Sequence, residues 1–135
     1  MRVLIIGGPK TGKTTVAKEM AESSGLEHLC TDPQRMCPPG VKGVPDKLDW
    51  SGASAYVAAE WLGKKDTIIE GVALPRALRK WRVENPDQPP PCDHVFILNE
   101  PHLDLSTGQA AMGKGVDTVL KELYDWLEPV IAKNV

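Results

Sequence analysis

The chain has 135 residues, a length that suits one domain with a single core and is too short for two. Sixteen Lys and Arg residues against eighteen Asp and Glu give a formal net charge of -2, which excludes a general attraction to polyanions and leaves only local patches for such contacts. Three irregularly spaced cysteines, no secretory-type leader before Val3 and no apolar run near the ~18 residues that cross a bilayer predict a soluble cytoplasmic protein with free thiols.

Strand and helix signals alternate along the first part of the chain. Residues 2–7 form a continuous apolar run typical of a buried parallel strand, and residues 14–24 carry an apolar helical face. Residues 27–30 predict a short second strand. Residues 33–49 are rich in proline and glycine, so we expect no regular structure there and interpret residues 32–50 as a loop or lid over a ligand.

The alternation continues through the middle of the chain. Ser51 is expected to cap a helix over residues 51–62. The apolar segment 66–71 predicts the third strand, and Pro75 suits the first turn of the helix that follows it. Residues 94–99 predict the fourth strand.

The last helical region is predicted to have two parts. Residues 116–131 repeat apolar side chains at the 3.6-residue period of a helix. The start of the region is expected to be broken, with a joint at Gly113 and Gly115. We therefore interpret residues 100–115 as a lid-like segment.

These elements predict a single α/β domain over residues 1–135. Right-handed crossovers would place about four parallel strands in one short sheet with helices on both faces, a three-layer arrangement. Loops at the carboxyl ends of parallel strands meet at one edge of a sheet. We therefore expect Gly8, Asp32, Glu70 and Asn99 to lie at this edge.

The segment GGPKTGKTT joins the first strand to the first helix. Gly7, Gly12, Lys13 and Thr14 match G-x-x-x-x-G-K-[ST], a loop whose backbone N–H groups bind phosphates together with the helix N-terminus. Lys13 is expected to reach the β- and γ-phosphates of ATP, and the Thr14 hydroxyl to hold Mg²⁺. The alternative, a glycine turn without a ligand, does not require this lysine and threonine. The predicted nucleotide site comprises Gly7, Gly8, Pro9, Lys10, Thr11, Gly12, Lys13, Thr14 and Thr15.

Two carboxylates are candidates for the chemistry beside the phosphates. Asp32 follows the second strand, where a carboxylate can accept the proton of an attacking hydroxyl, so we predict it as catalytic base and substrate contact. Its alternative role is capping of the turn at Pro33. Glu70 ends the third strand and is predicted to hold Mg²⁺ through water, and its alternative is an ion pair with Arg76 or Arg79.

Cationic and aromatic side chains supply further candidates. Arg76, Arg79 and Lys80 occupy neighbouring helical positions and would suit an acceptor that bears phosphate, and a solvated basic face has the same pattern. Lys114 is predicted to act as a lid cation in catalysis, and a Gly-Lys-Gly surface turn is its alternative. Trp50 is expected to stack on the acceptor or, alternatively, to pack beside the cap of the following helix.

Cysteine and histidine residues do not follow a metal-binding pattern. Cys30, Cys37 and Cys92 with His28 or His94 do not form the paired short spacings of a zinc site. We interpret the thiols as buried or incidental.

Taken together, these segments resemble a known class of enzymes. GGPKTGKTT and IIEGVALPRALRKW resemble small P-loop kinases, a class that includes adenylate, shikimate and gluconate kinases and in which an acidic-Gly pair precedes an arginine helix. The segments TD, LDWS, LNEP and TGQAAMGKG resemble, more narrowly, compact P-loop kinases encoded by bacteriophages. Some of these phosphorylate 5-hydroxymethyluracil in DNA. The resemblance therefore implies ATP, Mg²⁺ and an acceptor in DNA that carries a hydroxymethylated base, in the host cytoplasm.

The sequence also departs from this class. Pro33 stands where related kinases often carry a second acid, and residues 35–47 lengthen the loop at the acceptor. The fifth strand that helps to hold adenine in larger relatives is not predicted. With DNA as acceptor, phosphate contacts would come from Arg79, Lys80, Arg82, Lys42 and Lys47.

Three functions remain open on these patterns. The first is a kinase that moves the γ-phosphoryl group of ATP to a hydroxyl, either on 5-hydroxymethyluracil in DNA or on a nucleoside, nucleotide or other small metabolite. The second is an NTPase switch or motor, which would require an aspartate at the end of a strand and a residue that positions water. The third is a regulatory module that binds ATP without transferring phosphate. No pattern indicates the oligomeric state.

Overall fold

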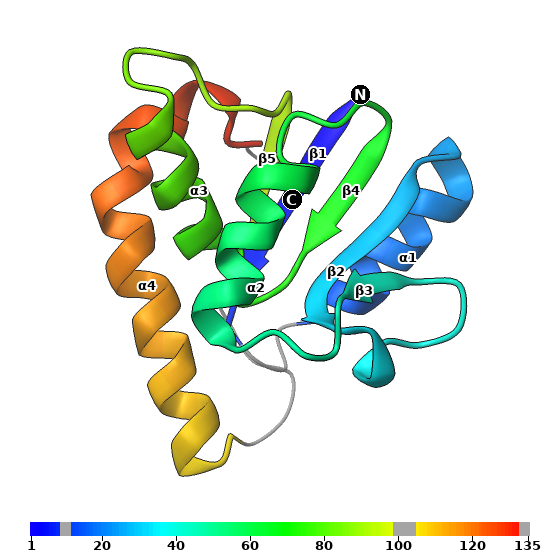
Figure 1. Ribbon diagram of the computed structural model, residues 1–135. Helices are drawn as coiled ribbons and strands as arrows, with labels where there is room; N and C mark the ends of the chain where they lie inside the picture. The colour runs from blue at the N-terminus through cyan, green and yellow to red at the C-terminus, as the bar shows by residue number, and fades with distance from the viewer. Residues whose placement is uncertain (9–11, 99–104, 133–135) are drawn as a thin grey trace.

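Five parallel strands form one sheet, in the order β3-β2-β4-β1-β5, in the computed structural model (Figure 1). The structure describes residues 1–8, 12–98 and 105–132. The strands are β1 (Arg2–Gly7), β2 (Glu27–Pro33), β3 (Lys42–Val44), β4 (Thr67–Glu70) and β5 (His94–Leu98). The helices are α1 (Lys13–Ser24), α2 (Trp50–Tyr56), α3 (Leu74–Glu84) and α4 (Thr107–Leu127), with short helical segments η1 (Gln34–Met36), η2 (Val57–Trp61) and η3 (Glu128–Val130).

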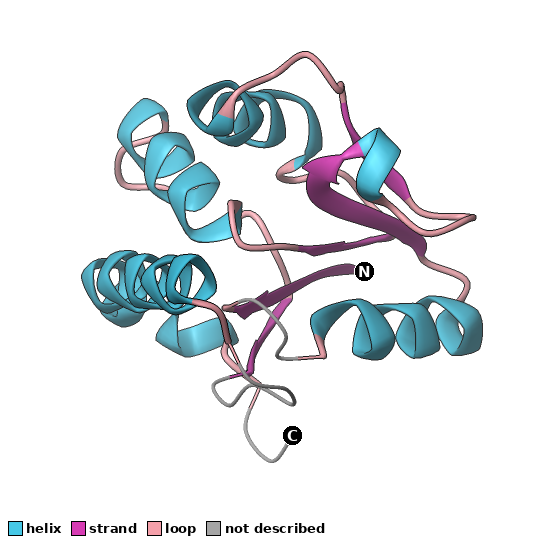
Figure 2. Ribbon diagram, turned by 90° about the horizontal axis from the view of Figure 1, so that it is seen from below, coloured by secondary structure: helices cyan, strands magenta, loops and turns pink. Residues whose placement is uncertain are grey.

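Helices cover both faces of the sheet, which confirms the predicted three-layer α/β fold. Successive side chains of a strand point to opposite faces, so the continuous apolar run of β1 contributes side chains to the core on each face of the sheet. Val3 and Ile5 pack toward α1, whereas Leu4 and Ile6 pack in the cluster formed with α2, α3 and α4. Figure 2, viewed from below Figure 1, shows α1 on one side of the strands and α2 and α3 on the other.

The sheet has one strand more than predicted. Residues 33–49 were expected to lack regular structure, yet they contain β3, which pairs with the outer edge of β2 in an irregular register. Val44 is completely buried. A single buried side chain and a few backbone hydrogen bonds hold this short edge strand, which explains why its sequence shows no periodic signal.

The opposite edge of the sheet also extends beyond the prediction. Ile131 forms a parallel bridge with Val95, and the Ala132 N–H donates to the Val95 carbonyl oxygen at 2.8 Å. This bridge lies beside β5, on the side where the sequence predicted no further strand.

Helix α2 begins at Trp50, directly after the proline-rich segment 33–49. Asp49, not Ser51, is its N-cap, and the Asp49 side chain accepts a hydrogen bond from the Gly52 N–H at 2.7 Å. Trp50 is therefore the first helical residue and does not precede the cap as a staple would. The helix continues as the π-helical segment η2, which ends at Trp61, one residue before the predicted end.

Helix α4 is continuous, so the predicted joint at Gly113 and Gly115 is wrong. Ser106 and Gln109 form a capping box, in which the Ser106 side chain accepts from the Gln109 N–H at 3.2 Å and the Ser106 N–H donates to the Gln109 side chain at 2.9 Å. The predicted apolar stripe is confirmed, because Val116, Val119, Leu120, Leu123 and Leu127 are buried. Although α4 has 21 residues, neither it nor any other described helix is long and apolar enough to cross a bilayer.

The lid-like segment predicted over residues 100–115 is only partly described. Residues 100–104 lie outside the described part of the chain, and residues 107–115 are the first turns of α4. Figure 1 shows this half of α4 reaching past the edge at which β1 and β4 end. The described part of this segment, residues 107–115, is therefore continuous helix and has no joint.

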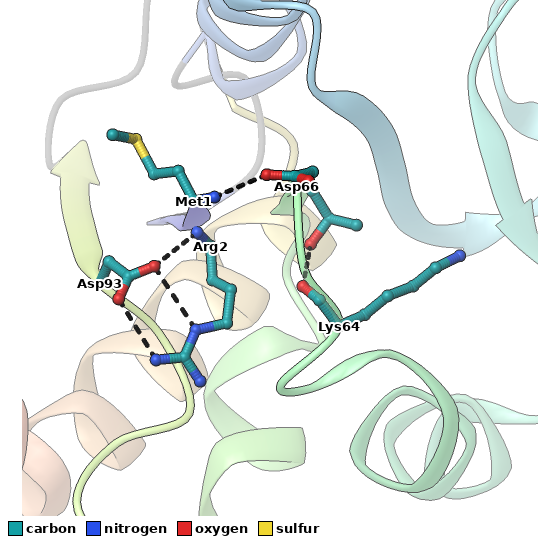
Figure 3. Close-up of polar contacts among 6 residues, drawn as sticks. Met1, Arg2, Lys64, Asp66 and Asp93 are labelled. Carbon is teal, nitrogen blue, oxygen red and sulfur yellow. Dashed lines mark hydrogen bonds and ion pairs between the residues drawn. The ribbon is translucent and has the colours of Figure 1, made fainter.

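Ionic contacts join the amino ends of three strands. The Met1 ammonium group donates to Asp66 at 2.7 Å, and the Arg2 backbone N–H donates to Asp93 at 2.7 Å (Figure 3). The Arg2 guanidinium group adds an ion pair to Asp93 at 3.2 Å. Hydrogen bonds from Arg2 and the N-terminal ammonium group lower the pKa of Asp93 and Asp66, respectively. These contacts align β1 with β4 and β5 at the end of the sheet away from the loops discussed below.

Gly71 sets the turn between β4 and α3, so we expect Gly71→Ala to lower the free energy of unfolding by about 3 kcal/mol. Its φ is +140°, and a Cβ there would lie 1.9 Å from Oγ1 of the buried Thr31. Urea denaturation measures the loss. Gly108→Ala in α4 is the matched control, because a Cβ at Gly108 meets nothing within 4 Å. Equal urea midpoints for Gly71→Ala and Gly108→Ala would contradict the close packing of Gly71 against Thr31.

Candidate functional site

The loop between β1 and α1 holds a buried cation. Lys13 is only 8% exposed, and its Nζ donates to the Gly8 carbonyl oxygen at 2.6 Å. Burial lowers the pKa of Lys13, while the nearby charges of Glu70 and Asp32 oppose that shift. A phosphate would offer this ammonium group a charged acceptor where it now has a neutral carbonyl. Pro9, Lys10 and Thr11 of the predicted site lie outside the described residues.

Glu70 receives two hydrogen bonds at the carboxyl end of β4. The Thr14 hydroxyl donates to Glu70 Oε2 at 2.9 Å, and His28 Nε2 lies 3.1 Å from the same oxygen. Glu70 is 1% exposed. The alternative pairing of Glu70 with an arginine is not what the structure shows: Arg79 faces Glu122 at 3.5 Å, and the Arg76 guanidinium lies 5.7 Å from the Trp50 ring centre.

Asp32 lies near the end of β2, beside the loop cation. It is part of the strand, and the Pro33 turn after it has no side-chain cap, so the capping alternative is not realised. Burial raises the pKa of Asp32, and Glu70 adds to this, whereas a hydrogen bond with Cys30 and the charge of Lys13 act in the opposite direction. A carboxylate with a raised pKa is a better proton acceptor near neutral pH.

Helix α4 approaches the end of β1 at two glycines, Gly113 and Gly8. A Cβ built on Gly8 would lie 3.1 Å from the Gly113 Cα, so the two backbones approach more closely than side chains would permit. Lys114 follows Gly113 and is exposed. The close approach explains a glycine inside a helix, and it brings the backbone that carries Lys114 to the loop of Lys13.

Trp50 and Arg76 line a cavity of about 250 Å³ beside these groups. The walls come from the start of α2, the turn after β4, the start of α3 and the first half of α4. The guanidinium group of Arg76 lies over the Trp50 ring in a cation–π contact, so an aromatic ring and a positive charge line the cavity side by side. The cavity is lined by Trp50, Val72, Pro75, Arg76, Ala111, Met112, Gly115, Val116 and Val119.

Arg79 and Lys80, predicted with Arg76 as acceptor contacts, do not line the cavity beside Trp50. They lie one helical turn beyond Arg76 and line a wider groove of about 670 Å³ between α2 and α3. Arg76 borders both this groove and the smaller cavity. The structure therefore brings Trp50 and Arg76 together, whereas Arg79 and Lys80 line only the wider groove.

The residues present suit a triphosphate and a magnesium ion. Gly12 has the left-handed conformation (φ +86°) that opens the loop ahead of α1, whose first N–H groups attract anions. Thr14 and Glu70 supply the oxygen donors that Mg²⁺ prefers, and they already touch one another. Among the described residues, no cluster of three or more His, Cys, Asp or Glu side chains forms a separate metal site.

His28 is the functional candidate that the sequence did not indicate. Its ring reaches Glu70 only because β2 and β4 are neighbours, with Cys30 in register with Glu70. The sequence predicts the alternation of side chains within each strand, but it does not predict that β2 and β4 are neighbours.

Comparisons with known proteins agree with this architecture. Neither a protein-family model nor a curated protein matched the sequence. Among solved structures, the chain is similar to a shikimate kinase from Acinetobacter baumannii in complex with shikimate, with a TM-score of 0.51 and 15% identity over 98% of this chain and 83% of that chain. The chain therefore shares the arrangement of strands and helices of this shikimate kinase.

Proposed function

We propose that this protein is a P-loop kinase that transfers the γ-phosphoryl group of ATP to a hydroxyl group. The observation that carries the proposal is the meeting of Lys13, Asp32 and Glu70 at the carboxyl edge of the sheet. Burial lowers the pKa of Lys13 and raises that of Asp32 there, and the attraction between these two side chains opposes both shifts. A cation, a base and a metal-binding carboxylate are the groups that phosphoryl transfer requires.

The proposed chemistry assigns one step to each side chain. Asp32 accepts the proton of the acceptor's hydroxyl group while the oxygen of that hydroxyl group attacks the γ-phosphorus. The bond between the γ-phosphorus and the oxygen of the departing ADP breaks. Lys13 stabilises charge on the phosphates, and Lys114 approaches the transferred group from α4. When bound, Mg²⁺ would be held by Thr14 and, through water, by Glu70, and it would neutralise phosphate charge.

The acceptor is proposed to place one ring in the cavity beside Trp50 and Arg76. The finer proposal, that this ring is 5-hydroxymethyluracil in DNA, is supported by the sequence resemblance to bacteriophage kinases and by the groove along Arg79 and Lys80, which could hold flanking phosphates. A small metabolite is the alternative. It is supported by the small volume of the cavity, about 250 Å³, and by the shikimate bound in the structurally similar kinase.

Labelled ATP offered with a panel of acceptors tests the proposal. The panel contains nucleosides, nucleotides, hydroxy acids that include shikimate, and single-stranded DNA with 5-hydroxymethyluracil. We expect label in one class of acceptor and ADP release that depends on it. ATP binding without transfer to any alcohol would indicate a regulatory module, and ATP hydrolysis without an acceptor would indicate an NTPase.

Once an acceptor is known, Trp50→Ala should raise its KM by about 10-fold, because stacking on an aromatic ring contributes about 1–3 kcal/mol. The KM for ATP should not change, since Trp50 lines the acceptor cavity. Steady-state kinetics with each substrate varied in turn separates the two constants. Tyr124→Ala is the matched control, because Tyr124 is an exposed aromatic residue on the later turns of α4. Equal KM values for the acceptor in Trp50→Ala and Tyr124→Ala would contradict the placement of the acceptor's ring in this cavity.

A further inference from the structure

Strand alternation places His28 and Glu70 on the same face of the sheet. Leu29 and Ile69 belong to the core beneath α2, α3 and α4, whereas Ile68 packs toward α1. Residues adjacent to Leu29 and Ile69 in each strand therefore face α1. His28 pairs in register with Ile68 and Cys30 with Glu70, so His28 and Glu70 are diagonal neighbours on adjacent strands beneath the start of α1.

One carboxylate oxygen joins three elements of the fold. Glu70 Oε2 on β4 receives the Thr14 hydroxyl of α1 at 2.9 Å and lies 3.1 Å from His28 Nε2 of β2. The side chains of His28 and Glu70 are only 5% and 2% exposed. An ionised carboxylate can only accept hydrogen bonds, so His28 must carry its hydrogen on Nε2 in this contact.

The contact restricts the position of a buried carboxylate. A buried polar group that loses its partner incurs a desolvation cost and turns toward another donor. Of the two donors to Glu70, His28 and Thr14, only Thr14 would remain if His28 were removed. The Thr14 hydroxyl is also the group proposed to hold Mg²⁺. Partners behind a metal-binding carboxylate fix its orientation and influence the affinity for the metal.

We propose that His28 is a positioning residue for the magnesium site, which donates through Nε2 to Glu70 and holds that carboxylate against Thr14. The inference rests on the proposed function, because it concerns how Glu70 and Thr14 are arranged for the metal that accompanies ATP. His28 does not touch the substrate and acts through Glu70. The same link between β2 and β4 also places the segment that carries Asp32 beside the segment that carries Glu70.

The test compares the binding of a nonhydrolysable ATP analogue with and without Mg²⁺ by calorimetry. The wild-type chain should bind the analogue more tightly with Mg²⁺. In His28→Leu, which has a similar volume and no donor, this Mg²⁺-dependent gain should fall by about 10-fold or more, while the Kd without Mg²⁺ stays the same. His28→Gln places an amide donor near the position of Nε2 and should recover most of the gain. His94→Leu, at the exposed amino end of β5, is the matched control.

Each outcome supports or overturns the inference. A full Mg²⁺-dependent gain in His28→Leu would overturn it, and so would an equal loss in His28→Leu and His28→Gln, since only packing would then matter. If His28→Leu does not fold, NMR of ¹⁵N-histidine in the wild-type chain decides, because a bare Nε2 on His28 contradicts the contact. A wild-type chain that ignores Mg²⁺ would instead refute the proposed function, and that result is read without any variant.

Discussion

Lys13→Ala is expected to reduce phosphoryl transfer by about 10³-fold, equivalent to about 4 kcal/mol of transition-state stabilisation. The ammonium group is buried inside the loop and hydrogen-bonded to the Gly8 carbonyl oxygen, so no exposed lysine can take its place. In the proposed site, its removal takes away the one cation held at the loop itself and leaves the backbone donors, Mg²⁺ and Lys114 of α4 to stabilise the phosphates. Transfer of label from ATP to the acceptor, measured at saturating acceptor, gives the loss directly.

The control for this prediction is Lys18→Ala. Lys18 is exposed on the same helix, α1, and its loss removes one positive charge without touching the loop. We expect its activity to match the wild-type value. Comparable activity of Lys13→Ala and Lys18→Ala would mean that the phosphates do not lie against the loop before α1.

Asp32→Asn is expected to preserve ATP binding and to lower kcat by about 10²–10⁴-fold, the usual contribution of a general base. The amide keeps the size of the side chain and its place at the end of β2 but cannot accept the hydroxyl proton. Calorimetry with ATP and single-turnover kinetics separate the two effects. Asp46→Asn, an exposed aspartate in the loop over residues 32–50, is the matched control.

The pH profile adds an independent check on Asp32. Burial raises the pKa of this carboxyl group, and only its ionised form accepts a proton. The value of kcat/KM should therefore fall as the pH drops through a pKa above the ordinary range of aspartate, and Asp32→Asn should lack this acidic limb. If Asp32→Asn keeps both the limb and the full rate, another group is the base.

Local chain chemistry explains what the sequence could predict. The strand before Gly7 and the helix after Lys13 have strong sequence signals, and the glycine-lysine-threonine motif between them predicts a phosphate-binding loop. Asp32 and Glu70 could be placed at one edge because parallel strands end together. Each of these inferences depends on neighbouring residues or on a general rule of topology.

Contacts distant in sequence explain what could not be predicted. β3 exists because Val44 reaches the core beside β2, and His28 meets Glu70 because β2 and β4 are adjacent. Gly113 is tolerated inside α4 because its backbone packs on Gly8, so a residue that usually weakens a helix gains a tertiary role here. Pattern alone predicted a joint at this position, and only the packing shows a continuous helix.

A crystal structure with magnesium and a nonhydrolysable ATP analogue tests the central claim most directly. We predict that the β- and γ-phosphates lie in the loop over residues 7–15, with Lys13 Nζ moved from the Gly8 carbonyl oxygen to the phosphate oxygens. An empty loop at saturating nucleotide, or phosphates bound elsewhere on the chain while Lys13 keeps its bond to Gly8, would contradict it.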